Sequence, residues 1–164
     1  MLVLGIDPGI ATTGYGLVEY SKGRERLVDY GVISTPSSRE MSLRLVKINN
    51  DLTTIINEYN PEMAAIEQIF YNKNSKTVIT VAQGRGVAMM TAANAGLPVS
   101  EYTPLQVKQA VVGYGNAEKK QVQLMIQKIL SIPKMPKPDD AADALAVAIC
   151  HIHSYRLKAL QKLI

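Results

Sequence analysis

The chain has 164 residues, 47% of them hydrophobic, and a formal net charge of +4. This length and composition predict a single globular domain, spanning 1–164, with a sizeable buried core. They exclude a membrane-spanning helix, because apolar runs such as Ala144–Cys150 stop far short of the roughly 18 residues that a span requires. The first residues carry no basic leader, and Cys150 is the single cysteine. We therefore expect a cytoplasmic protein without a signal peptide or an intramolecular disulfide.

Basic charge is unevenly distributed along the chain. No Asp or Glu occurs between Gln68 and Ser100, and every charged residue from Lys119 to Lys137 is a lysine. Segregated basic segments are typical of proteins that bind polyanions, although ordinary solvated faces produce the same pattern. Nucleic acid is therefore one candidate partner.

The N-terminal third of the chain has the alternation and turn residues of β-structure. We expect strands at 2–7, 14–20 and 26–34. Their short connections favour antiparallel neighbours. Apolar residues at steps of three and four then predict a helix over 38–59, which Asn60 and Pro61 end.

The remainder of the chain alternates between strands and helices. The apolar run 63–66 predicts a central strand covered on both faces, and 70–77 is polar and turn-prone. Further on we expect a strand at 97–102 and helices at 77–95, 104–112, 117–130 and 140–162. Three antiparallel strands followed by alternating units predict an α/β domain with a five-stranded mixed sheet and helices on both faces.

Four carboxylates occupy positions that suggest a common site. Asp7 ends the first strand and Glu67 ends the fourth, so adjacent strands would place both at one edge of the sheet. Asp140 and Asp143 open the last helix and are three residues apart, which puts them on one helix face. Clustered carboxylates repel one another, and a pair of Mg²⁺ ions relieves this while activating water toward a phosphodiester.

Each acid also has a simpler explanation when it is considered alone. Asp7 is a plausible turn residue, and Glu67 could be solvated at a strand end. Asp139 and Asp140 suit the N-cap of a helix, and Asp143 suits its first turn. The hypothesis of a metal site depends on the joint pattern, because folding alone does not require all of these acids.

Six segments carry a resemblance to a known family: "LGIDPG", "TGYG", "AIEQIF", "GRGVA", "VKQAVVGYGNAEK" and "DAADALAVAI". In this order and spacing they resemble the RuvC Holliday-junction resolvases, the crossover junction endodeoxyribonucleases of the ribonuclease-H-like superfamily. The resemblance runs from residue 2 to about 153. It implies a homodimer that makes paired symmetric nicks in four-way junction DNA during recombination and repair. It also implies two Mg²⁺ ions per subunit, with Mn²⁺ as a substitute, and a partnership with the RuvA–RuvB branch-migration complex.

The resemblance also assigns roles to individual residues. It implies that the catalytic acids and metal ligands are Asp7, Glu67, Asp140 and Asp143. It places Phe70 in a loop that stacks on DNA bases, and it matches Lys108 and Lys119 to lysines that act on DNA. The charge pattern adds four further candidate DNA contacts, Lys73, Lys76, Arg85 and Lys120.

Two ambiguities and several alternatives remain open from the sequence. Asp139 competes with Asp140 for the first helical ligand position, and Lys120 competes with Lys119. Phe70 and Cys150 could simply be core residues, and the candidate lysines could be ordinary residues of exposed helix faces. His151 and His153 could bind a metal or could have a structural role. Gly84 and Gly86 weaken a helix and suggest a close approach of DNA or of a second subunit.

Three other functions fit part of the pattern. A RuvC-like nuclease of ribosomal RNA shares the "GIDPG" start, but without the "EQIF" loop and the basic helices. An actin- or sugar-kinase-like ATPase needs a second similar domain, for which 164 residues leave no room. A junction-binding protein without catalytic activity does not require all four acids.

Overall fold

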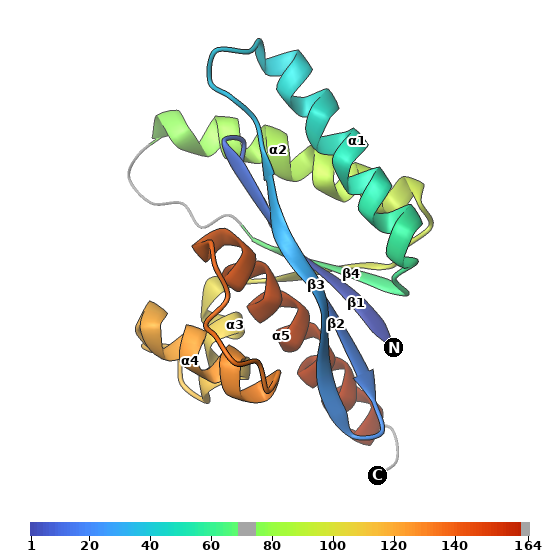
Figure 1. Cartoon of the computed structure of the whole chain (residues 1–164), viewed down its shortest axis with the longest axis vertical. Helices are drawn as coiled ribbons and strands as arrows, with labels where there is room; N and C mark the ends of the chain where they lie inside the picture. Colours follow the sequence, from blue (N-terminus) through green and yellow to red (C-terminus); the bar gives the residue numbers. More distant parts are fainter. Residues whose placement is uncertain (69–74, 162–164) are drawn as a thin grey trace.

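The computed structural model describes residues 1–68 and 75–161, without the side chains of 75–77 and 160. The elements follow in the order β1 (Leu2–Asp7), β2 (Thr12–Ser21), β3 (Arg24–Ser34), α1 (Met41–Tyr59), β4 (Met63–Glu67), α2 (Ser75–Asn94), β5 (Val99–Tyr102), α3 (Pro104–Val112), α4 (Lys119–Ile129) and α5 (Asp139–Gln161). Figure 1 shows α1 and α2 on one side of the sheet and α3, α4 and α5 on the other.

The strands form a five-stranded mixed sheet in the order β3-β2-β1-β4-β5. β1, β2 and β3 pair antiparallel, whereas β4 and β5 run parallel to β1. The expected sheet, with three antiparallel strands first and helices on both faces, is therefore confirmed. The adjacency of β1 and β4 is the feature that matters most for function, because it brings the ends of two parallel strands together.

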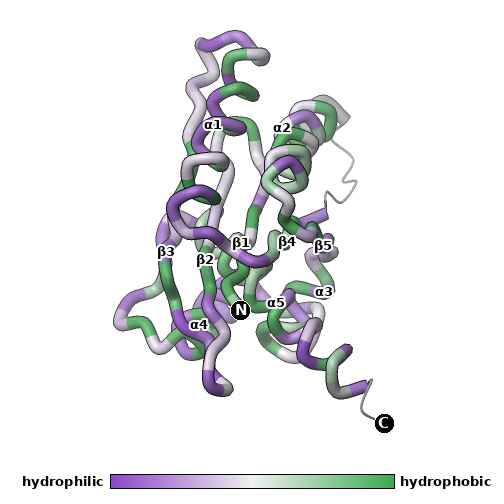
Figure 2. Tube along the Cα trace, turned by 90° about the vertical axis from the view of Figure 1, so that its right-hand side faces the viewer, coloured by the Kyte–Doolittle hydropathy of each residue, from purple (hydrophilic) through white to green (hydrophobic). Residues whose placement is uncertain are grey.

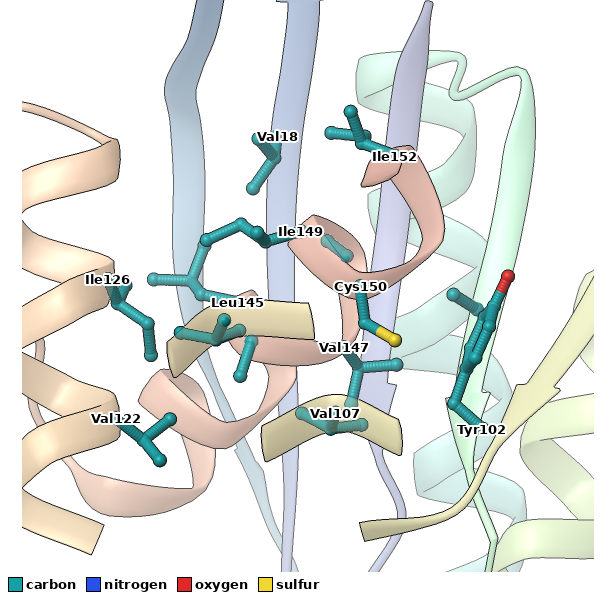
Figure 3. Close-up of a cluster of buried hydrophobic side chains, with 14 of the residues drawn as sticks. Val18, Tyr102, Val107, Val122, Ile126, Leu145, Val147, Ile149, Cys150 and Ile152 are labelled. Atoms are coloured by element: carbon teal, nitrogen blue, oxygen red, sulfur yellow. The ribbon is translucent and has the colours of Figure 1, made fainter. Parts of the chain in front are cut away.

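Alternation along β1 separates two hydrophobic cores. Leu4 and Ile6 pack into the core that the sheet forms with α1 and α2. Val3 faces the other core, which is built on α5 and which Figure 3 shows around Leu145. Since successive side chains of a strand point to opposite faces, Asp7 shares the α5 face with Val3. In Figure 2 the hydrophobic residues of β1 and β4 lie near the centre of the molecule.

Every element boundary lies within three residues of the expected one, and the predicted bounds of β1 and α3 match at both ends. α1 begins at Met41 rather than at residue 38, because a turn precedes it in which the Arg39 amide donates to the Pro36 carbonyl at 3.2 Å. α2 begins at Ser75, inside the stretch 70–77 that was expected to be a turn. Within the described residues, no helix is long and apolar enough to cross a membrane.

Candidate active site

Asp7 and Glu67 lie side by side as the last residues of two adjacent strands. The parallel register pairs Ile6 with Ile66, so the next residue of each strand is an acid. Alternation places Ala65 in the α5 core, and therefore Glu67 on that same face, as it does for Asp7. The expectation that adjacent strands would present both carboxylates at one edge is confirmed. Both carboxyl groups lie near the start of α5, since the charge of Asp143 raises the pKa of each.

Three glycines allow α5 to lie directly against the sheet. A Cβ atom on Gly5 or on Gly14 would overlap a carbonyl oxygen of α5, and one on Gly16 would lie 2.8 Å from Leu145. These glycines share the α5 face of β1 and β2, where larger side chains would hold the helix away. The Gly14 contact is with the Asp140 backbone, so the start of α5 is fixed beside Asp7, the register partner of Gly14. This role was not predicted, although the glycines at 5, 14 and 16 in two neighbouring strands are a signal of such a close approach.

Two threonine hydroxyls, one in β2 and one directly after β3, hold the turn that follows Asp7. The Thr13 hydroxyl donates to the Gly9 carbonyl at 2.6 Å, and the Thr35 hydroxyl donates to the Ile10 carbonyl. Gly84 of α2 packs on this turn, since a Cβ there would meet Ile10 at 3.0 Å. The glycine that was expected to admit DNA or a second subunit therefore admits the chain's own turn.

The carboxyl groups oppose one another's ionisation. Burial raises the pKa of Asp7 to about 8, and the charges of Glu67, Asp143 and Asp140 add to this increase. Burial and the charge of Asp143 likewise raise the pKa of Glu67 to about 7, although a hydrogen bond with Asp7 acts in the other direction. Burial also raises the pKa of Asp143. Without a bound cation, this edge of the sheet therefore retains protons near neutral pH.

Lys119 supplies positive charge to this cluster from the first turn of α4. Its ammonium group lies 3.0 Å from Asp143 and 3.2 Å from Asp139. Burial acts to lower the pKa of Lys119, but the hydrogen bonds and charges of the two aspartates raise it overall. Lys119 therefore partly neutralises the carboxylates in this structure.

The doubled aspartate at the start of α5 divides into two different environments. Asp139 is exposed, and its carboxylate accepts a hydrogen bond from Gln123 at 2.9 Å as well as facing Lys119. Hydrogen bonds from Lys119 and Gln123 lower the pKa of Asp139. Asp140 is half-buried, and its charge contributes to the raised pKa of Asp7. Asp139 thus faces α4, whereas Asp140 acts on the strand-borne acid.

A pocket of about 230 Å³ opens beside these acids. It is lined by Glu67, Pro104, Val107, Lys108, Lys119, Val122, Asp143 and Ala146. In the described part of the chain, no three His, Cys, Asp or Glu side chains converge closely enough to form a ready-made metal site. The donor set nevertheless fits Mg²⁺ by its chemistry, because hard carboxylate oxygens are its preferred ligands and these acids repel one another without a cation.

Comparison with known proteins decides the family. The family model described as "Crossover junction endodeoxyribonuclease RuvC" matches residues 3–151. The chain belongs to the RuvC family. It is 67% identical over 159 residues to a crossover junction endodeoxyribonuclease RuvC of Syntrophomonas wolfei, covering 97% of this chain and 92% of that protein.

Two solved structures of RuvC from Thermus thermophilus have the same fold. The first superposes with a TM-score of 0.90 at 35% identity, covering 96% of this chain and 97% of the other. The second is that RuvC in complex with a Holliday junction substrate, with a TM-score of 0.87 at 33% identity and 96% coverage of both chains. The ribonuclease-H-like fold expected from the motifs is thereby confirmed.

The candidate DNA contacts of this RuvC-family chain fall into three groups. Phe70 and Lys73 lie outside the described residues, and Lys76 lies in α2 without a described side chain. Lys108 and Lys119 line the pocket beside the acids. Lys120 is exposed on α4, next to Lys119.

The side chain of Arg85, unlike the exposed side chain of Lys120, is turned toward the protein. Its Nε atom donates to the Glu67 carbonyl at 3.3 Å, and its terminal nitrogen forms an ion pair with Glu101 of β5. Neither partner was predictable from the sequence. Arg85 therefore contacts the backbone of a catalytic candidate from the α2 side of the sheet.

The histidines and the cysteine of α5 take part in packing. His151 is buried, and its Nδ1 atom lies 3.0 Å from the Tyr102 hydroxyl. His153 Nδ1 lies 2.9 Å from the Ala110 carbonyl of α3. Cys150 is buried, as expected for a core residue, and Figure 3 shows it between α5 and Tyr102.

Proposed function

We propose that this chain is a structure-selective DNA endonuclease that resolves Holliday junctions by paired symmetric nicks in homologous recombination and DNA repair. The observation that carries this proposal is the pair of partly buried acids, Asp7 and Glu67, at the ends of adjacent parallel strands beside Asp143. Membership of the RuvC family and the likeness to a RuvC solved with a Holliday junction substrate support the choice of DNA.

The proposed metal ligands are the four acids, Asp7, Glu67, Asp140 and Asp143. We propose two Mg²⁺ ions per subunit, with Mn²⁺ as a substitute. When bound, such ions would lower the pKa of water and stabilise charge on the phosphate oxygens. Asp7 and Glu67 must release protons for this binding, since their raised pKa values keep them protonated near neutral pH. Asp143 must also exchange its ion pair with Lys119 for the metal.

The reaction is hydrolysis of one phosphodiester in each of two strands. The oxygen of water bonds to phosphorus, the bond from phosphorus to the 3′ oxygen breaks, and that oxygen leaves with a proton. The products are a 5′-phosphate and a 3′-hydroxyl, which a ligase can rejoin. Lys108 and Lys119 line the pocket beside the acids, where their charge favours the phosphate of the strand that is cut.

The wider contact with DNA is proposed to use the remaining basic residues and one aromatic. Phe70 would stack on bases at the junction centre, a contact worth roughly 1–3 kcal/mol per base. Lys73, Lys76 and Lys120 would hold phosphates, and their number sets how steeply binding weakens with salt.

A homodimer suits a substrate with two symmetry-related strands to cut. Large apolar side chains are exposed on α1 and α2, among them Leu43, Val46, Ile79 and Met90. They support this proposal by offering a surface for a second copy, and light scattering would give the mass in solution. We further propose that the enzyme acts in the cytoplasm together with the RuvA–RuvB branch-migration complex.

The test is cleavage of a synthetic four-way junction in Mg²⁺ by the wild type and by Asp7→Asn. We expect paired, symmetric nicks that ligase can seal, and a loss of at least about 10³-fold in the variant, because bound metal contributes several kcal/mol. Linear duplex DNA and structured RNA serve as control substrates. Absence of paired nicks in the junction, or a preference for the RNA, would overturn the proposal.

A further inference from the structure

The strand end that carries Glu67 has an unusual backbone environment. The ladder between β1 and β4 ends at the pair Ile6 and Ile66. Pro8 comes directly after β1 and has no backbone N–H with which to extend the ladder alongside Glu67. On the other side, the Gln68 amide still donates to the Tyr102 carbonyl at 2.8 Å, so β5 supports this end. The support from β1 therefore stops just where the carboxylate must be placed.

Arg85 provides a donor at this position from the opposite face of the sheet. Its Nε atom donates to the Glu67 carbonyl at 3.3 Å. The same guanidinium is paired with Glu101, which is the register partner of Ile66 on β5. Tyr102 lies in the α5 core, so its neighbour Glu101 points to the α2 face, where Arg85 lies.

We propose that Arg85, held by Glu101, is a positioning residue that fixes the backbone of Glu67 and thereby aims its carboxylate at the metals. This inference rests on the proposed function of the site. One guanidinium ties together the end of β4, the edge strand β5 and helix α2. A planar, multidentate donor suits such a position, because it can bond to a carbonyl and a carboxylate at once.

The same contacts make Arg85 a poor phosphate ligand. Only 20% of its side chain is exposed. A phosphate would have to displace Glu101, or approach a guanidinium whose charge that carboxylate already balances. A solvent-facing lysine such as Lys120 carries neither restriction. The structure therefore separates Arg85 from Lys120 as a candidate DNA contact.

The test compares Arg85→Gln, Arg85→Lys and Glu101→Gln with the wild type. Loss of a contact that orients a metal ligand typically changes metal affinity or activity by about 10–100-fold. We expect Arg85→Gln and Glu101→Gln each to lower the single-turnover rate on junction DNA within that range. The Mg²⁺ concentration at half-maximal rate should rise, while the metal-free Kd for the junction stays within about twofold.

Glu101→Gln distinguishes a positioning role from a DNA contact, because the two roles predict different effects on DNA binding and on cleavage. Loss of an acidic charge should leave DNA binding unchanged or strengthen it, yet we expect it to slow cleavage as Arg85→Gln does. Arg85→Lys keeps the charge but not the planar fork, so we expect it to be impaired as well. Full activity of Arg85→Lys would overturn the proposal. So would a junction Kd that rises in Arg85→Gln with a shallower salt dependence and an unchanged Mg²⁺ requirement.

Arg26→Gln is the matched control, since Arg26 pairs with Glu19 at 3.0 Å on the exposed hairpin of β2 and β3. It removes an arginine–glutamate pair beside Leu2, at the opposite end of β1 from Asp7, and we expect wild-type rates and Mg²⁺ dependence. Calorimetric titration with Mn²⁺ adds a readout that needs no DNA, and weaker binding is expected for Arg85→Gln. If the wild type fails to nick junctions, the proposed function fails, whereas the Mn²⁺ titration still decides the role of Arg85.

Discussion

The ammonium group of Lys119 lies 3.0 Å from the carboxylate of Asp143, and this ion pair joins the first turn of α4 to α5. Asp143 is also a proposed metal ligand. The same carboxylate therefore has two possible counterions, one supplied by the protein and one by solution. Half of the Lys119 side chain is exposed, at 51%, so the lysine can leave without being stranded in the core.

Lys119→Met should increase the affinity for Mg²⁺ while decreasing junction cleavage. The metal would no longer compete with the ammonium group, and an exposed ion pair is worth up to about 1 kcal/mol, or roughly fivefold in affinity. Cleavage should fall because the pocket loses a proposed phosphate contact. Calorimetry gives the affinity and a junction assay gives the rate. Lys120→Met is the control. An unchanged Mg²⁺ affinity in Lys119→Met would show that the ammonium group does not compete with Mg²⁺ for Asp143.

Metal binding should strengthen as the pH rises through neutrality. Asp7 and Glu67 have pKa values raised to about 8 and about 7, so both release protons when a cation binds. We expect tighter Mg²⁺ binding at pH 8.5 than at pH 6.5. Calorimetry in buffers of different ionisation enthalpy would count the released protons. Binding that is independent of pH, with no proton release, would show that the acids are already ionised.

The stability of the metal-free protein should have the opposite pH dependence. The folded chain keeps a proton on Asp7 that the unfolded chain loses above its ordinary pKa of 3.8. Each group of this kind lowers the unfolding free energy by up to about 1.4 kcal/mol per pH unit, until the folded pKa near 8 is passed. Urea unfolding in EDTA from pH 6 to 8.5 should therefore show falling stability. Asp7→Asn should weaken the dependence of stability on pH. Asp139→Asn should not, because the pKa of Asp139 is lowered in the folded chain and not raised.

The two aspartates at the start of α5 should respond differently to the same substitution. Asp140→Asn should reduce junction cleavage by about 10²-fold or more, since Asp140 is half-buried and its charge acts on Asp7. Asp139→Asn should retain most of the activity, because Asp139 is exposed and bonded to Gln123 and Lys119. Single-turnover rates at saturating Mg²⁺ provide the comparison. The reverse order of effects would make Asp139 the ligand.

Gly14→Ala should destabilise the protein and separate α5 from the sheet. The added methyl group would overlap the Asp140 backbone, and overpacking of this kind costs typically 1–3 kcal/mol or more. Gly86→Ala is the matched control, since its Cβ would enter open space in α2 and should add up to about 1 kcal/mol of stability. Urea unfolding measures both changes. A neutral Gly14→Ala would mean that α5 does not depend on this close contact.

The fold and the position of the acids were largely predictable because they depend on local patterns. The apolar runs at the start of the chain and at 63–66 predicted the strands, and the acids that end them were placed by the rule that sites form at strand ends. The order of elements predicted the mixed sheet. Boundaries were less predictable, as the turn at Pro36 before α1 and the early start of α2 illustrate.

The sequence by itself determined which residues are acidic and which strand and helix ends carry them, because apolar runs and helical periodicity are properties of the chain. Tertiary structure decided how these groups are balanced. Three contacts join elements that are separated in sequence. They are the ion pair of Lys119 with Asp143, the hydrogen bond from Arg85 to Glu67, and the packing of α5 against Gly14. Such contacts depend on helix placement and side-chain direction, which only packing of the whole domain fixes.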